Sequence, residues 1–217
     1  MKFLKILFAG LFTASTAQAV HAAEPMDRHD TGLAIRNLVW AGFETQADIE
    51  VIISEEYLDP ADLNATDRQW IRKETAGLFE EKRDEEKTWP KETDVDRLEA
   101  AFEQLGKVDI IALHNAGNTR SDGRSDAEDE YHARKEAGRS SRGWLFYHAQ
   151  DVDGALSGGE LHIAFGAFED ADNMAPVIAR EAMAVLGQHG LKAEWDGDVG
   201  QRIRVAPFLW RKRSPAE

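Results

Sequence analysis

The chain has 217 residues, of which 42% are hydrophobic and 30% are charged, as is ordinary for a globular protein long enough to bury a core. Its 40 acidic and 26 basic side chains give a formal net charge of -14 at pH 7, which repels phosphate backbones and argues against nucleic acid as a partner. The sequence has no cysteine, which excludes a disulfide framework, a lipoprotein anchor and thiolate metal sites.

Residues 1–23 have the pattern of a secretory signal peptide. Two lysines near the start precede an apolar run over residues 6–12, and small side chains follow it. We expect cleavage after Ala19 or Ala22.

The signal peptide predicts a periplasmic or secreted protein, in which residues 24–30 form a linker. No apolar run reaches roughly 18 residues, so we expect no stable membrane span. The alternative is that Met26 is the true start of the protein, which would make it cytoplasmic.

Residues 31–106 have the spacing of helices. Apolar side chains recur every three to four positions, and two pairs with the spacing of a capping box, Thr45 with Asp48 and Thr93 with Asp96, predict helix starts. We expect this part to be all helical.

Residues 107–213 alternate between short β-rich runs and helical runs. The predicted fold class is therefore α+β, an N-terminal helical region followed by a mixed sheet of about five strands with packed helices. Residues 31–213 are expected to form one domain, with residues 214–217 as a tail. The expected strands are 109–114, 144–148, 161–165, 191–195 and 202–205, the last as an edge or hairpin strand, and the expected helices are 125–137, capped by Ser125 and Glu128, and 173–189.

Two histidines follow neighbouring predicted strands. If the helix from Ser125 is a crossover, the strands ending at His114 and His148 are parallel, and both histidines lie at strand carboxyl ends, where open α/β sheets place ligands. The candidate ligand-binding residues are His114, Asn115, His148 and Asp151, and the candidate catalytic residues are His148, Asp151 and Tyr147.

The same residues could instead have structural roles, or some of them could bind a metal. His114, His148 and Asp151 contain the ligand types of a metal triad, but no dense ligand spacing is present and no metal or other cofactor is assigned. Alternatively, His148 shares the apolar face of its strand, and Asp151 is the N-cap of a short helix. Three aromatic side chains are expected in the core, Trp144, Trp195 and Phe165.

Three segments carry a resemblance to a known family. They read TWPKETDVDRLEAAFEQL, GWLFYHAQDVDGALSGGELHIAFG and LKAEWDGDVGQRIRV. With these segments the chain resembles DUF6891, a family of uncharacterised bacterial proteins, over roughly residues 31–213. The resemblance implies the fold and its boundaries rather than a mechanism.

The chain departs from this family in the stretch 112–117, where many relatives carry cysteines that resemble part of a metal or redox site. Here that stretch offers only His114 and Asn115, so a thiolate role does not transfer.

Two function classes remain. The first is an exported, non-catalytic module that binds a small polar ligand or a protein partner at the strand ends. The second is a hydrolase that uses His148 as general base, with Asp151 orienting it and Tyr147 or His114 assisting, around a divalent metal or without one. The enzyme requires these side chains to converge on one point, whereas the binding module requires only a concave surface.

Overall fold

The computed structural model of the chain describes residues 25–168 and 171–216. The predicted signal peptide, residues 1–23, lies outside the described residues. The chain forms two compact units, one of residues up to 87 together with those from 213 onward, and one of residues 88–212.

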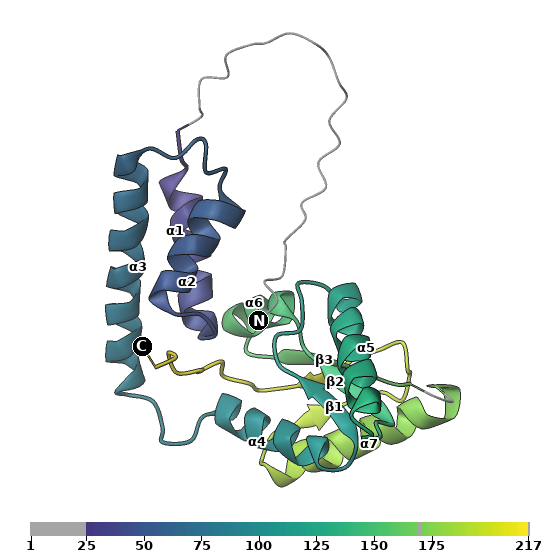
Figure 1. Cartoon of the computed structure of the whole chain (residues 1–217). Coiled ribbons are helices and arrows are strands. Elements are labelled where there is room, and N and C mark those ends of the chain that lie inside the picture. The colour runs from purple at the N-terminus through teal and green to yellow at the C-terminus, as the bar shows by residue number, and fades with distance from the viewer. Residues whose placement is uncertain (1–24, 169–170, 217) are drawn as a thin grey trace, which may run out of the picture. The chain divides into compact units, whose positions relative to one another are not determined.

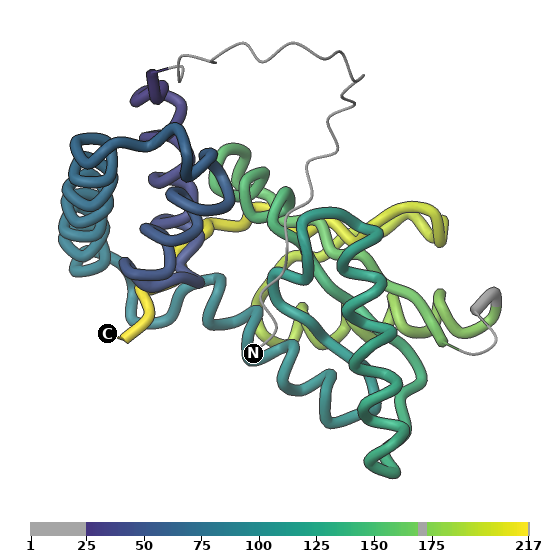
Figure 2. Tube along the Cα trace, turned by 45° about the horizontal axis from the view of Figure 1, so that its top comes forward, coloured from purple at the N-terminus to yellow at the C-terminus, as the bar shows by residue number. Residues whose placement is uncertain are grey.

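The first unit is a cluster of helices around an apolar core. Its elements are α1 (Arg28–Ala41), α2 (Gln46–Val51), the π-helix η1 (Ile52–Tyr57) and α3 (Ala65–Glu86), which contact one another (Figures 1 and 2). The predicted capping box of Thr45 and Asp48 is present at the start of α2. The core residues are Ile35, Val39, Ile49, Ile53, Ile71, Leu78 and Phe79.

The second unit contains a five-stranded mixed sheet with helices packed on it, which confirms the predicted α+β class. The strand order is β1-β2-β3-β5-β4, with β1 and β2 parallel and the other neighbours antiparallel. The elements are α4 (Asp94–Gly106), β1 (Ile110–Leu113), α5 (Arg120–Glu136), β2 (Gly143–Phe146), α6 (Ala149–Gly158), β3 (Leu161–Ala167), α7 (Ala171–Gln188), β4 (Ala193–Glu194) and β5 (Ile203–Val205) (Figure 1).

Alternating side chains of β2 separate the helices onto the two faces of this sheet. The Cα of Gly143 faces Ile178 of α7, so closely that an added Cβ would lie 2.5 Å from that side chain. Trp144 and Phe146 instead pack in a cluster with Ala127 of α5. Because successive side chains of a strand point to opposite faces, α7 and α5 cover opposite sides of the sheet.

The predicted edge or hairpin strand at residues 202–205 is a hairpin strand, because β5 pairs antiparallel with the preceding strand β4. It is not an edge, because β3 pairs with its other side. Other element ends also differ from the prediction. Helix α5 begins at Arg120, five residues before the predicted start, because Thr119 and Asp122 form its capping box. Strand β2 ends at Phe146, two residues before the predicted end, since His148 is already the N-cap of α6.

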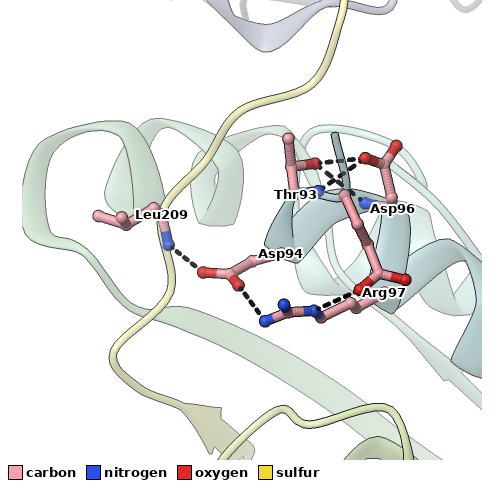
Figure 3. A network of polar contacts seen from close by, with 6 residues as sticks. Thr93, Asp94, Asp96, Arg97 and Leu209 are labelled. Carbon is pink, nitrogen blue, oxygen red and sulfur yellow. Dashed lines mark hydrogen bonds and ion pairs between the residues drawn. The ribbon is translucent and has the colours of Figure 1, made fainter. Parts of the chain in front are cut away.

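The start of α4 holds the C-terminal segment of this unit (Figure 3). The predicted capping box of Thr93 and Asp96 is present, with the backbone N–H of Thr93 donating to the Asp96 carboxylate at 2.8 Å. Asp94 accepts the backbone N–H of Leu209 at 2.9 Å and also pairs with Arg97. The segment that follows β5 is thereby attached to the start of α4.

No helix of the described residues is long and apolar enough to cross a membrane.

Candidate functional site

The carboxyl ends of β1 and β2 lie next to each other, as the crossover through α5 predicts. The loops that leave the two strands are joined by backbone hydrogen bonds, from Ala116 N–H to Tyr147 O (2.9 Å) and from Ala149 N–H to Gly117 O (3.1 Å). Gly117 has φ of 59°, and an added Cβ would lie 2.3 Å from the Cβ of Asp122. Only glycine permits so close an approach of the loop to α5.

His114 and Tyr147 form one polar pair at this edge. The His114 Nδ1 and the Tyr147 hydroxyl are 3.0 Å apart and hydrogen-bonded, and the imidazole stacks on Phe102 of α4 with ring centroids 4.6 Å apart. Tyr147 is 1% exposed, and its ring also meets Trp210 of the C-terminal segment. Desolvation lowers the pKa of His114 although the residue as a whole is exposed, and Glu99 opposes the shift. The neutral imidazole is therefore the favoured form.

His148 and Asp151 form a second pair, which includes Arg202 of the loop before β5. The Asp151 carboxylate accepts the backbone N–H of His148 at 3.1 Å and pairs through its other oxygen with the Arg202 guanidinium. His148 Nδ1 lies 3.2 Å from the same carboxylate but has no hydrogen-bond partner in the described structure. Burial lowers the pKa of His148, Asp151 raises it, and Arg202 lowers it further.

This arrangement gives Asp151 a different structural role from the predicted one. Helix α6 is present, but His148 occupies its N-cap position and Asp151 lies three residues later, as the carboxylate of the capping box. Both side chains are buried, at 4% and 6% exposure of the residue. A buried carboxylate needs a charge partner, and Arg202 supplies it.

The structure thus brings the candidate residues together as two pairs. No hydrogen bond or ion pair among the described residues joins the pair of His114 and Tyr147 to the pair of His148 and Asp151. Asn115, in the left-handed region with φ of 49°, has a buried side-chain oxygen that accepts no hydrogen bond from the described part of the chain. Nowhere in residues 25–168 and 171–216 do three or more His, Asp or Glu side chains gather as a metal site.

A cleft of about 690 Å³ adjoins the second pair, and Arg202 forms part of its wall. This volume falls within the range of small-molecule sites. The residues that line the cleft are Arg120, His162, Glu194, Trp195, Asp196, Gly200, Gln201, Arg202 and Arg204.

The three arginines of the cleft differ in how they are held. Arg202 pairs with the buried Asp151, and Arg204 pairs with Glu160 (2.7 Å) and Glu194 (2.9 Å). The side chain of Arg120, the first residue of α5, makes no hydrogen bond or ion pair with the described residues. The cleft therefore offers guanidinium groups whose N–H donors are only partly used.

These lining residues were not among the predicted site residues. The alternation of Arg202 and Arg204 on either side of Ile203 was a signal in the sequence, since it places two arginines on one face of a strand. Trp195 was predicted to lie in the core but is only half-buried. Its indole meets Phe165 edge-on at 5.3 Å and donates to Asp198 O at 2.9 Å, so one part of the ring remains available to the cleft.

Comparison of the sequence with known protein families finds one that matches. Residues 24–214 match the sequence profile of DUF6891, a domain of unknown function. Neither a curated protein nor a solved structure matches the chain.

Proposed function

The chain belongs to the DUF6891 family, a domain of unknown function, and we propose that it is a non-catalytic binding module that holds a small ligand with an anionic group in the cleft beside Arg202. The observation that carries this proposal is the anchored guanidinium. A guanidinium has five N–H donors, and among the described residues Arg202 uses one of its nitrogens, on Asp151. Arg202 also lines a cleft large enough for a ligand.

The anchor matters because it removes much of the cost of ordering a long side chain. A free arginine loses rotamer entropy of about 2 kcal/mol when a ligand fixes it. Arg202 has already lost part of that freedom, because the Asp151 carboxylate that holds it is buried and is itself fixed by His148 N–H. A guanidinium held in this way binds carboxylate or phosphate oxygens with defined geometry.

The candidate residues His148 and Asp151 hold Arg202 in place without lining the cleft. Neither lines the cleft, but Asp151 orients Arg202, and His148 orients Asp151. Their role in this proposal is to position the guanidinium rather than to touch the ligand.

The hydrolase alternative is weaker on the same geometry. It requires Asp151 to orient His148 as a base while Tyr147 assists. The Asp151 carboxylate is engaged by Arg202, and Tyr147 is bonded to His114 and enclosed by aromatic rings. A general base must also reach a substrate, and His148 is only 4% exposed.

Isothermal titration with acetate, succinate and inorganic phosphate tests the proposed function. We expect at least one of them to bind at one molecule per chain, and Arg202→Gln to weaken that binding at least tenfold, or about 1.4 kcal/mol. Lys107→Gln is the control, because it removes one positive charge from the same unit at an exposed pair with Glu103. The proposal fails if no anion binds more tightly than about 10 mM, or if both variants lose affinity equally.

Export is the second part of the proposal, and it rests on the signal-peptide pattern of residues 1–23. Fractionation of the native host, with mass determination of the mature N-terminus, tests it. A chain found in the periplasm or medium and beginning after Ala19 or Ala22 is the expected result. Full-length protein in the cytoplasm contradicts export.

A further inference from the structure

The cleft beside Arg202 is lined by charges of both signs. Its positive groups come from the start of α5 and from β5 with the loop before it, and its negative groups come from β4 and the turn that follows it. The positive residues are Arg120, Arg202 and Arg204, and the negative residues are Glu194 and Asp196.

Most of these charges are already compensated within the protein. Asp151 compensates Arg202, and Glu160 and Glu194 compensate Arg204. Two charges of the lining remain without an oppositely charged partner among the described residues, Arg120 and Asp196. A ligand that matches the cleft electrostatically therefore carries one negative and one positive group.

The turn that carries Asp196 is held in one conformation by its own hydrogen bonds. The Asp196 carboxylate accepts Asp198 N–H at 2.9 Å, and the Asp198 carboxylate accepts Gly200 N–H at 2.8 Å. The Trp195 indole N–H donates to Asp198 O at 2.9 Å. An ammonium group that binds Asp196 thus meets a carboxylate already in place, beside an aromatic ring that attracts cations and apolar groups.

We propose that the ligand of this cleft is a zwitterion with a carboxylate and a primary ammonium group, of the class of short peptides. The carboxylate pairs with the guanidinium groups of Arg120 and Arg202, and the ammonium group pairs with Asp196. A volume of about 690 Å³ accommodates two or more residues, and Trp195 supplies a surface for one apolar side chain. This inference rests on the proposed function, since it names the ligand class of the same cleft.

Three probes separate the two charges of the ligand. They are the dipeptide alanyl-phenylalanine, its N-acetyl derivative, which lacks the ammonium group, and its C-terminal amide, which lacks the carboxylate. Titration calorimetry on the full mature chain measures each. We expect the free dipeptide to bind at least tenfold more tightly than either derivative, because each derivative leaves one charge of the cleft without a partner.

Two substitutions assign each preference to its residue. Asp196→Asn removes the negative charge but keeps an oxygen for Asp198 N–H, and we expect it to abolish the preference over the N-acetyl form. Arg202→Gln should reduce the preference over the amide, because only Arg120 then remains to pair with the carboxylate. Glu103→Gln, at an exposed pair with Lys107, should leave all three affinities unchanged. Far-ultraviolet circular dichroism and a melting curve confirm that each variant is folded.

The outcomes separate this inference from the proposed function. If the N-acetyl form binds as tightly as the free dipeptide, or if Asp196→Asn keeps the full preference, the ligand is a simple anion, so the zwitterion fails while the anion site stands. The same holds if phosphate, acetate or succinate binds and none of the three peptides does. If neither the peptides nor the anions bind, both proposals fail.

Discussion

Asp151 is the residue on which the anchored guanidinium of the cleft depends, so its replacement tests the construction of the site. Asp151→Asn preserves the size of the side chain and removes its charge. The asparagine oxygen still accepts His148 N–H, so the capping contribution of about 1 kcal/mol is retained. What is lost is the charge-assisted bond to Arg202.

The size of that loss follows from the burial of the pair. Breaking a fully buried ion pair costs about 3 to 5 kcal/mol, whereas hydrogen bonds to charged groups contribute about 1.5 to 3 kcal/mol. The Asp151 side chain is 4% exposed but that of Arg202 is 28% exposed, so water can solvate part of the guanidinium charge when the pair is broken. We therefore expect Asp151→Asn to lower the free energy of unfolding by about 2 kcal/mol, and Asp151→Ala, which also loses the cap, by about 3 kcal/mol.

Urea unfolding followed by tryptophan fluorescence and by circular dichroism measures these values. Because the chain has two compact units, both signals must report the same transition before free energies are compared. A double-mutant cycle with Arg202→Gln should give a coupling of about 1 to 2 kcal/mol, whereas Glu103→Gln, in an exposed pair, should leave the free energy of unfolding almost unchanged. An Asp151→Asn variant as stable as the Glu103→Gln control would refute the reasoning.

Three further predictions concern packing and protonation. Gly123→Ala should destabilise the protein by about 1 to 3 kcal/mol, because the new Cβ would lie 2.4 Å from the ring of Phe146 in β2. Gly154→Ala, which has open space in α6, should instead stabilise it by about 0.5 to 1 kcal/mol. Equal melting temperatures for the two variants would contradict the close packing of α5. Trp144→Ala should lower the free energy of unfolding in urea by about 3 to 5 kcal/mol, because Trp144 is buried. Trp195→Ala should lower it clearly less, because Trp195 is half-buried, and should weaken dipeptide binding. A larger loss for Trp195→Ala than for Trp144→Ala would contradict this assignment of the core. The lowered pKa of His114 means that the unfolded chain binds more protons than the folded chain just below pH 6.5. The contribution of His114 to stability is therefore complete above that pH and falls as the pH drops towards the folded pKa. Between pH 7 and pH 5 the free energy of unfolding should fall less for His114→Asn than for the native chain, and an equal fall would exclude the shift.

The elements that the sequence predicts correctly are those encoded by neighbouring residues. The capping boxes of Thr45 with Asp48 and Thr93 with Asp96 are each complete within four positions, and the structure contains both. The start of α5 was misplaced for the same reason. Thr119 with Asp122 and Ser125 with Glu128 have the same spacing, and nothing local shows which of the two pairs begins the helix.

The site was predicted only in part, because its contacts join distant positions. His114 and His148 follow two parallel strands, as the crossover argument requires. Yet the partner of Asp151 is Arg202, 51 residues away, and no local pattern relates them. The position of β5 inside the sheet also depends on its pairing with β3, which the alternation of its own residues does not show.

The large negative charge of the chain and its arginine-lined cleft are compatible if the ligand has no net charge. At physiological ionic strength a charge is screened beyond about 8 Å, so a bound ligand is governed by the groups of the cleft itself. An approaching ligand, however, meets the field of a protein with a net charge of -14, which disfavours the encounter with a simple anion. A zwitterion avoids this repulsion, and on arrival it can pair with both Arg120 and Asp196. The charge of the whole chain and the charges of one cleft thus favour the same class of ligand.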